Sequence, residues 1–355
     1  MKFKPDFATT AARFEAWWRG EVLDRPPVTL GVQPTRPYRG PVSQHVTLRE
    51  RWLDAEFQVA TAITRMEQTD YLGDSFPILF SNIGPEITAT LLGCELEFGE
   101  HTSWSKPVVH EAGQWAEISS RPPDFQNVYW QTMERATALA RERCDGRYLV
   151  GITDLHDSFD MLAALRDLQL LCVDLLDCPE LVQRTALHAA NIFAEAFDRC
   201  YRPGTGSTCW TPFYHAGPAY VPSCDFWCMI SPEMARDQVV PTKQIEMAAL
   251  ERSIFHLDGP QALKHLDTTL ALPGLTALQW VYGAGQGPAA RWLDVYRRAL
   301  AAGKSVQVIA ETPADAFAVL DALGPRGVWF TVGECFATVA EANAFLTAIE
   351  QRSRG

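Results

Sequence analysis

The sequence lacks the features that mark several large classes of protein. It has no block of lysine or arginine residues, and its formal net charge is −12 with a pI near 5.2. A charge of this sign repels nucleic acid and anionic membrane surfaces. No apolar stretch reaches membrane-spanning length, and the two early lysines are not followed by the apolar run of a signal peptide. We therefore expect a soluble, cytoplasmic protein that binds neither nucleic acid nor membranes.

Local redox and catalytic motifs are also missing. The chain has nine cysteines, an odd number, and they are scattered without a CxxC pair. We expect most of them to be reduced and buried. GxSxG, HExxH and P-loop motifs do not occur. The chemistry must therefore be sought in residues that the fold brings together.

What the sequence does contain is a repeated succession of strand and helix patterns. Such alternation predicts parallel strands joined by right-handed crossovers. We predict an α/β fold, a single (β/α)8 TIM-barrel domain over residues 1–355, with an N-terminal helix and an elaborated loop or flap around residues 95–125. Strands are expected near residues 25–32, 77–80, 148–154, 206–214, 253–258, 275–281, 305–311 and 327–333.

An open, doubly wound sheet with a dinucleotide site is the alternative fold. It would require GxGxxG after a strand, and that spacing is absent. The glycine-rich segment GAGQGP (283–288) precedes a helical pattern, so it is read as a turn and helix entry, with anion binding as the other interpretation.

Polar side chains gather where the expected strands end. The carboxyl ends of barrel strands converge on the face that carries the active site. The residues at these ends are Asn82, Asp154, His156, Tyr214, His215, His256, Asp258, Gln279, Trp280, Glu311, Glu334 and Cys335. With the loop after residue 214, this set predicts a pocket rich in metal ligands and titratable groups.

His256 and Asp258 form the sharpest pair in this set. They are separated by one residue, so in a strand both side chains point to the same side and can share an ion. Cys335 ends a later strand and is a third candidate ligand, and zinc accepts nitrogen, oxygen and sulfur donors together. The other interpretation is structural, with Asp258 capping the helix that starts near Pro260.

Two further segments supply candidate catalytic groups. In GITDLHDSFD (151–160), an acid and an imidazole at a strand end can act as acid and base, whereas Asp157 is explained by helix capping. The aromatic and polar loop around SCDFWCM is either a pocket lining or a packed Ω-loop. The predicted catalytic residues are Asp154, His156, Tyr214 and Asp225. The predicted substrate-binding residues are Asn82, His215, Trp227, Gln279, Trp280 and Glu311.

At HLDGPQALKHLD, LTALQWVYGAG, SPEM and NIGPEITATLLGCELEF, the sequence resembles the uroporphyrinogen decarboxylase-like superfamily, in particular its divergent branch related to corrinoid methyltransferases. The resemblance extends over nearly the whole chain and implies a barrel with its pocket at the strand carboxyl ends. The arginine-rich loop of the true decarboxylases is absent from VTLGVQPTRPYRG (28–40). The resemblance therefore does not imply porphyrinogen decarboxylation.

The same resemblance implies a zinc site. The zinc-dependent thiol methyltransferases of this branch carry a His-x-Cys pair and a later cysteine. His256 matches their histidine, Asp258 stands in place of the first cysteine, and Cys335 in GECFATVAEA matches the later one. The resemblance further implies a homodimer and a corrinoid carried on a separate partner protein, because no cobalamin-binding DxHxxG motif is present in this chain.

These observations lead to one main hypothesis and two alternatives. The main hypothesis is a zinc-assisted methyltransferase linked to a corrinoid protein, with His256, Asp258 and Cys335 as metal ligands. The first alternative is a metal-free decarboxylase or lyase that acts on a small carboxylated substrate. The second is a non-catalytic barrel that binds a small molecule.

Overall fold

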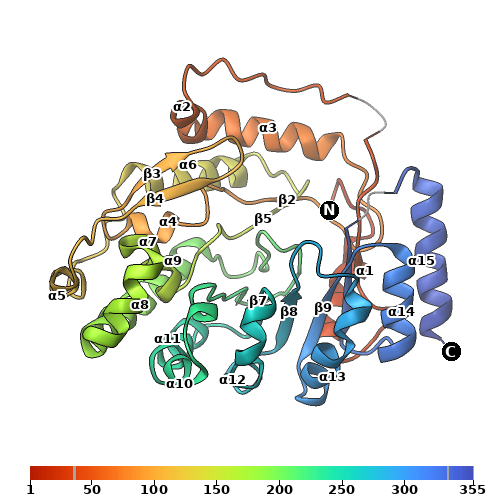
Figure 1. Cartoon of the computed structure of the whole chain (residues 1–355). Coiled ribbons are helices and arrows are strands. Elements are labelled where there is room, and N and C mark those ends of the chain that lie inside the picture. Colours follow the sequence, from red (N-terminus) through yellow and green to blue (C-terminus); the bar gives the residue numbers. More distant parts are fainter. Residues whose placement is uncertain (35–36, 334–335, 355) are drawn as a thin grey trace.

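A curled parallel sheet forms one wall of the molecule (Figure 1). The structure is a computed structural model, and it describes residues 1–34, 37–333 and 336–354. Six strands pair in parallel in the order β1-β10-β9-β8-β7-β6. Their bounds are β1 (Val28–Thr29), β6 (Ala219–Tyr220), β7 (Arg252–Asp258), β8 (Ala277–Val281), β9 (Ser305–Ala310) and β10 (Val328–Val332).

A separate pair of parallel strands consists of β2 (Ile78–Leu79) and β5 (Leu149–Val150). Hydrogen bonds connect the segments next to this pair to both edge regions of the large sheet. On one side, the Asp74 amide donates to the Val28 carbonyl of β1 at 2.7 Å, a few residues before β2 begins. On the other side, the Ile152 amide donates to the Thr208 carbonyl at 2.9 Å. The described strands thus form a curled parallel half-barrel with a second, shorter pair, and a fully closed barrel stays a prediction.

Helices and short turns of helix cover the outside of the strands (Figure 1). The helices are α1 (Phe7–Trp18), α2 (Leu48–Leu53), α3 (Ala55–Glu67), α4 (Ile87–Thr90), α5 (Trp115–Ile118), α6 (Val128–Glu142), α7 (Ser158–Arg166), α8 (Leu168–Asp177), α9 (Pro179–Cys200), α10 (Pro232–Met234), α11 (Val240–Met247), α12 (Leu266–Leu270), α13 (Leu293–Ala301), α14 (Pro313–Leu323) and α15 (Val339–Ser353). Short 3₁₀ turns are η1 (Ala112–Gln114), η2 (Phe226–Met229), η4 (Pro260–His265) and η5 (Ala289–Trp292), and η3 (Ala235–Val239) is a π-helical turn.

The predicted elaboration around residues 95–125 is present as a small layer outside the parallel strands. β3 (Glu95–Phe98) and β4 (Ser103–Lys106) form an antiparallel hairpin, and η1 and α5 follow it. The predicted N-terminal helix is α1, which buries Phe14 and Trp17. No helix among the described residues combines the length and the apolar character that crossing a membrane requires.

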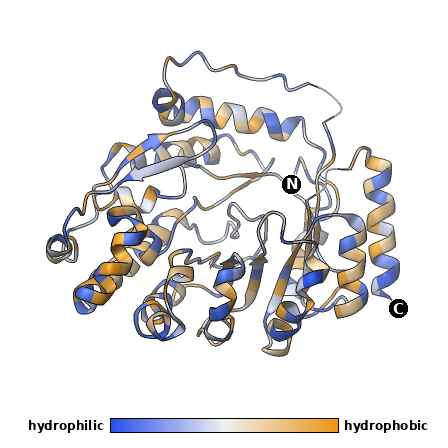
Figure 2. Cartoon of the chain, in the orientation of Figure 1, coloured by the Kyte–Doolittle hydropathy of each residue, from blue (hydrophilic) through white to orange (hydrophobic). Residues whose placement is uncertain are grey.

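The two faces of the large sheet differ in chemistry because side chains alternate along each strand. Figure 2 shows hydrophobic residues along β8 and β9, and Trp280 on β8 packs against Trp292 of the helical layer with ring centroids 5.3 Å apart. The opposite face carries a row of hydrogen-bonded polar side chains. Gln279 donates to Gln307 at 2.8 Å, and Gln307 donates to Thr331 at 2.9 Å. This polar row continues to His256 and so supports the candidate site.

Candidate functional site

A cavity of about 170 Å³ opens where β5, β6 and β7 end. Asp154 and His156 follow β5, Ser223 and Asp225 follow β6, and His256 lies on β7 two residues before its end. The full lining is Asp154, Leu155, His156, Trp210, Val221, Ser223, Asp225 and His256. We call this space the acidic cavity. Its position agrees with the rule that chemistry gathers at the carboxyl ends of parallel strands.

The polar row behind the cavity fixes the orientation of His256. The Gln279 amide nitrogen donates to Gln307 at 2.8 Å and to Thr211 at 3.1 Å, so the Gln279 carbonyl oxygen faces His256. The Nδ1 atom of His256 pairs with that oxygen, and it must be the donor in the pair. The lone pair of the neutral ring is therefore on Nε2, the atom available to a ligand.

Two carboxylates join His256 at the mouth of the cavity. Asp225, His256 and Asp258 each offer one ligand atom, and these atoms lie within 4.8 Å of one another. We call these three residues the His-Asp-Asp cluster. Both aspartates are accessible to solvent, and η4 receives no side-chain cap, so the predicted capping role of Asp258 is not realised.

The electrostatics of the His-Asp-Asp cluster favour a cation. Partial burial raises the pKa of Asp225, and the carboxylate of Asp160 raises it further. Partial burial also raises the pKa of Asp258, where nearby His256 lowers it and Asp225 raises it. Among the described residues, no lysine or arginine forms an ion pair with either aspartate. A divalent cation would relieve the repulsion between these two acids.

Asp154 supplies a different kind of group to the same cavity. Burial raises the pKa of its carboxyl, and the neighbouring His156 and His256 only partly oppose that rise. A carboxyl that retains its proton closer to neutral pH is suited to donate it to a substrate. Asp154 and His156, both predicted as catalytic residues, thus lie in one cavity with the candidate metal ligands.

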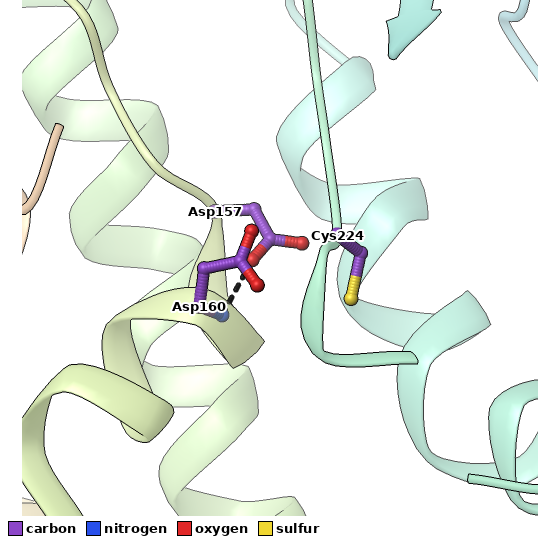
Figure 3. Close-up of side chains that lie close together, drawn as sticks. All are labelled: Asp157, Asp160 and Cys224. Atoms are coloured by element: carbon purple, nitrogen blue, oxygen red, sulfur yellow. Dashed lines mark hydrogen bonds between the residues drawn. The ribbon is translucent and has the colours of Figure 1, made fainter. Parts of the chain in front are cut away.

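A second acidic cluster, formed by Asp157, Asp160 and Cys224, lies buried next to the cavity (Figure 3). Its acids already have partners. Asp157 accepts from the Asp160 amide at 2.7 Å and pairs with the buried ammonium of Lys243. Asp160 accepts from the amides of Asp225 and Phe226 at 3.0 and 2.9 Å. This cluster is therefore a structural support for the loop that carries Asp225.

Cys224 groups with Asp157 and Asp160 in this second cluster and is not one of the three residues of the His-Asp-Asp cluster. Its side chain is buried, and burial raises the pKa of its thiol, with Asp160 adding to the effect. Cys94, Cys200 and Cys209 are likewise buried, and the eight cysteines of the described chain are all unpaired. The remaining cysteine, Cys335, lies outside the described residues together with Glu334, so its role as a metal ligand stays a prediction.

The expectation that Tyr214 and His215 lie at a strand's carboxyl end is wrong. The predicted strand 206–214 is not a strand of the sheet: Ser207 and His215 form only an isolated antiparallel bridge, and the parallel strand is β6 at Ala219–Tyr220. His215 contacts Glu15 of α1 at 3.0 Å and Glu251, just before β7, at 3.2 Å. Tyr214 packs edge-on against Phe7. Both residues thus lie at the amino-terminal edge of the sheet.

The two predicted tryptophans are core residues rather than pocket residues. The Trp227 side chain is buried and stacks on His265 with ring centroids 4.8 Å apart, and the Trp227 backbone carbonyl accepts from the His265 imidazole at 2.7 Å. Trp280 faces the helical layer, as described above. Neither lines the acidic cavity. The alternation of side chains along β8 turns Trp280 to the packed side, and Trp227 lies on η2 with its ring against Phe255 and His265.

The other predicted binding residues occupy three different positions. Gln279 lies behind His256 and orients it. Glu311 is exposed just beyond β9 and lines neither the acidic cavity nor the larger cavity beside β2. Asn82 lines a second and larger cavity beside the end of β2. Sequence reasoning missed Trp210, whose ring meets His256 edge-on at 5.4 Å, because it lay inside a segment predicted as a strand.

Comparison with known proteins adds a likeness of fold. No model of a known protein family matches the chain, and no curated protein matches it at a significant level. Among solved structures, a methyltransferase from Methanosarcina mazei superposes with a TM-score of 0.64 at 14% sequence identity. The match covers 98% of this chain and 99% of that one. The chain therefore shares the fold of that protein over almost its entire length.

Proposed function

We propose that this protein is a metal-assisted methyltransferase. Its divalent cation would be zinc, held by Asp225, His256 and Asp258. The observation that supports this most directly is the meeting of one imidazole and two carboxylates within 4.8 Å at the acidic cavity. The methyltransferase-like fold points in the same direction. Relative to the sequence prediction, Asp225 moves from the catalytic residues to the metal ligands.

The donor set fits such an ion. Zinc accepts imidazole nitrogen and carboxylate oxygen, and catalytic zinc sites have three protein ligands and one open position. Replacing thiolate by carboxylate ligands leaves more positive charge on the metal and makes it a harder acid. Cys335, which the resemblance to zinc-dependent methyltransferases suggests, is a further proposed ligand.

The residues of the site would then have separate roles in methyl transfer. When bound, the cation would lower the pKa of a coordinated thiol or hydroxyl group, which supplies the nucleophile at neutral pH. Gln279 accepts from Nδ1 of His256, which would leave Nε2 for the cation. Asp154 and His156 line the same cavity and would give or take the proton that the acceptor exchanges. The methyl carrier would be a corrinoid on a separate protein, as the resemblance implies.

Metal analysis tests the proposal. Protein purified without chelator, or reconstituted with zinc and desalted, should contain about one equivalent of zinc per chain. His256→Ala and the double variant Asp225→Asn, Asp258→Asn should lose most of that zinc. The control variant His110→Ala lacks an exposed histidine outside the cavity and should retain its zinc. Zinc-free wild type after reconstitution, or equal zinc in the His256→Ala variant, would contradict the proposal.

A second function is favoured by one observation, the raised pKa of Asp154 beside His156 in the same cavity. This pair would serve a metal-free decarboxylase or lyase on a small carboxylated substrate, with Asp154 as the proton donor. Turnover that survives dialysis against a chelator and disappears in Asp154→Asn would support this second function over the first.

A further inference from the structure

A second cavity of about 480 Å³ lies beside the carboxyl end of β2. One wall is α3, and another is the extended segment 37–47, which Figure 1 shows running along α3 toward α2. Its lining is Tyr38, Pro41, Ser43, Arg51, Trp52, Phe57, Gln58, Val59, Thr61, Ala62, Arg65, Leu79, Phe80, Ser81, Asn82, Glu100, His101 and Ala136. We call it the aromatic cavity. Its volume is that of a site for a small organic molecule.

The apolar part of the lining suits a flat ring. Tyr38, Trp52, Phe57 and Phe80 contribute four aromatic side chains. Trp52 is held in place, because its indole nitrogen donates to the Gly99 carbonyl at 2.8 Å and its ring stacks on Phe98 at 5.6 Å. A fixed aromatic wall binds planar ligands at a low cost in side-chain entropy.

The polar part of the lining offers unused donors. Arg65 lies over the Tyr38 ring at 5.5 Å and has no carboxylate partner among the described residues. In the same described structure, the Asn82 side chain accepts from the Gly84 amide at 2.7 Å while its own amide group donates no hydrogen bond. The lone acid of the lining, Glu100, already pairs with Arg51 at 2.8 Å. The free charge of the cavity is therefore positive.

The extended segment is fastened over this space. The Arg39 amide donates to the Gln68 side chain at 3.0 Å, and Gln68 donates back to the Arg39 carbonyl at 2.8 Å. Nearer α2, His45 contacts Asp54 at 2.9 Å and packs edge-on against Phe57 at 5.0 Å. The cavity thus has a defined wall on its outer side.

The two cavities open from adjacent strand ends. β2 and β5 pair in parallel with Leu79 opposite Val150, and beyond the last paired residues the Thr153 hydroxyl donates to the Ser81 carbonyl at 2.6 Å. Asn82 follows Ser81 and lines the aromatic cavity, and Asp154 follows Thr153 and lines the acidic cavity. The two cavities therefore lie at the carboxyl ends of paired, neighbouring strands.

We propose that the aromatic cavity binds a planar aromatic molecule that carries one anionic group. The ring would lie against Trp52, Phe57 and Phe80, and the anion would contact Arg65 and the Asn82 amide. The binding itself follows from the lining residues. The further idea that this molecule is the substrate, with its reacting group directed toward Asp154, rests on the proposed function.

Calorimetric titration of the full chain with naphthoate and its neutral counterpart naphthamide tests the binding. Naphthoate should bind at least about tenfold more tightly, because only the carboxylate can make a charge-assisted hydrogen bond with Arg65. The preference should weaken with added salt, since Arg65 is exposed. Arg65→Met should abolish the preference, and Arg65→Lys should retain part of it.

A matched control is Arg297→Met, which removes an exposed helical arginine that has no ion pair in the described structure. It should bind naphthoate as wild type does. Equal affinity for naphthoate and naphthamide, an unchanged preference in Arg65→Met, or no saturable binding of either probe would overturn the proposal. His256→Ala should still bind naphthoate. A variant that loses zinc and retains this binding separates a failure of the metal hypothesis from a failure of the aromatic site.

Discussion

Single side chains in the polar row decide how His256 presents itself to a ligand. A histidine ligand binds best when its second nitrogen is fixed by a hydrogen bond, because that bond sets both the tautomer and the ring orientation. In this chain the fixing group is the Gln279 carbonyl, which is itself oriented by Thr211 and Gln307. All three lie behind the acidic cavity rather than in its lining.

Replacing Gln279 by methionine removes the acceptor for His256 Nδ1 and conserves most of the volume. We expect zinc affinity, measured by competition with a coloured chelator, to fall by about 10- to 100-fold, the range seen when such supporting residues are lost. Gln131→Met, on the surface of α6, is the control and should leave the affinity unchanged. If Gln279→Met bound zinc as tightly as wild type, His256 would not depend on the polar row.

At the scale of the element, the loop between β6 and α10 carries Asp225 and is held by α7 and α11. Lys243 of α11 is fully buried and donates to the Ser223 carbonyl at 2.7 Å and to Glu246 at 2.7 Å, and it also pairs with Asp157 at the start of α7. The π-helical turn η3 comes just before Pro241, where the missing amide interrupts regular α-helical bonding. The ammonium thus connects two helices and the loop.

Lys243→Met should destabilise the protein strongly, because it leaves the carboxylates of Asp157 and Glu246 buried without their shared cation. The expected loss is about 3 to 5 kcal/mol in the free energy of unfolding. Urea denaturation followed by circular dichroism measures it. Lys106→Met, at a lysine that is 63% exposed, should change stability by less than about 0.5 kcal/mol. A loss of similar size in both variants would contradict this role for Lys243.

The helices and strands also show which structural features the sequence patterns could predict and which they could not. The period of two along 253–258 correctly placed His256 and Asp258 together, and Asp157 caps α7 as its position predicted. The strand near 206–214 was assigned wrongly because a short buried strand such as Ala219–Tyr220 has no periodicity of its own. That error moved the expected strand end from Asp225 to Tyr214. The pairing of Lys243 with Asp157 depends on helix packing and leaves no local signal.

For the molecule as a whole, the N-terminal segment is fastened to the sheet through charged groups. Arg13 of α1 binds Asp24 with two hydrogen bonds, at 2.6 and 2.8 Å, and reaches Asp74 at 2.9 Å. The fully buried Asp74 also accepts from the Val28 amide of β1 at 2.9 Å. These bonds connect α1 and β1 to the chain that leads into β2, across the gap between the two sheets.

The pH dependence of stability should report this connection. The hydrogen bond from Arg13 lowers the pKa of Asp24 from its usual 3.8 to about 2. A lowered folded-state pKa stabilises the protein above the unfolded-state pKa, and this contribution is lost as the pH falls toward 2. Asp24→Asn should therefore unfold more easily than wild type at pH 7, and the difference should shrink between about pH 4 and pH 2. Because the Asp24 side chain is 37% exposed, solvent screens the pair, and we expect a difference of at most about 1 kcal/mol.

Asp198→Asn, at an exposed aspartate without an ion pair in the described structure, should show no such trend. A deficit in Asp24→Asn that persisted unchanged at pH 2 would mean that the asparagine disturbs packing and that the charge of Asp24 does not hold α1 in place.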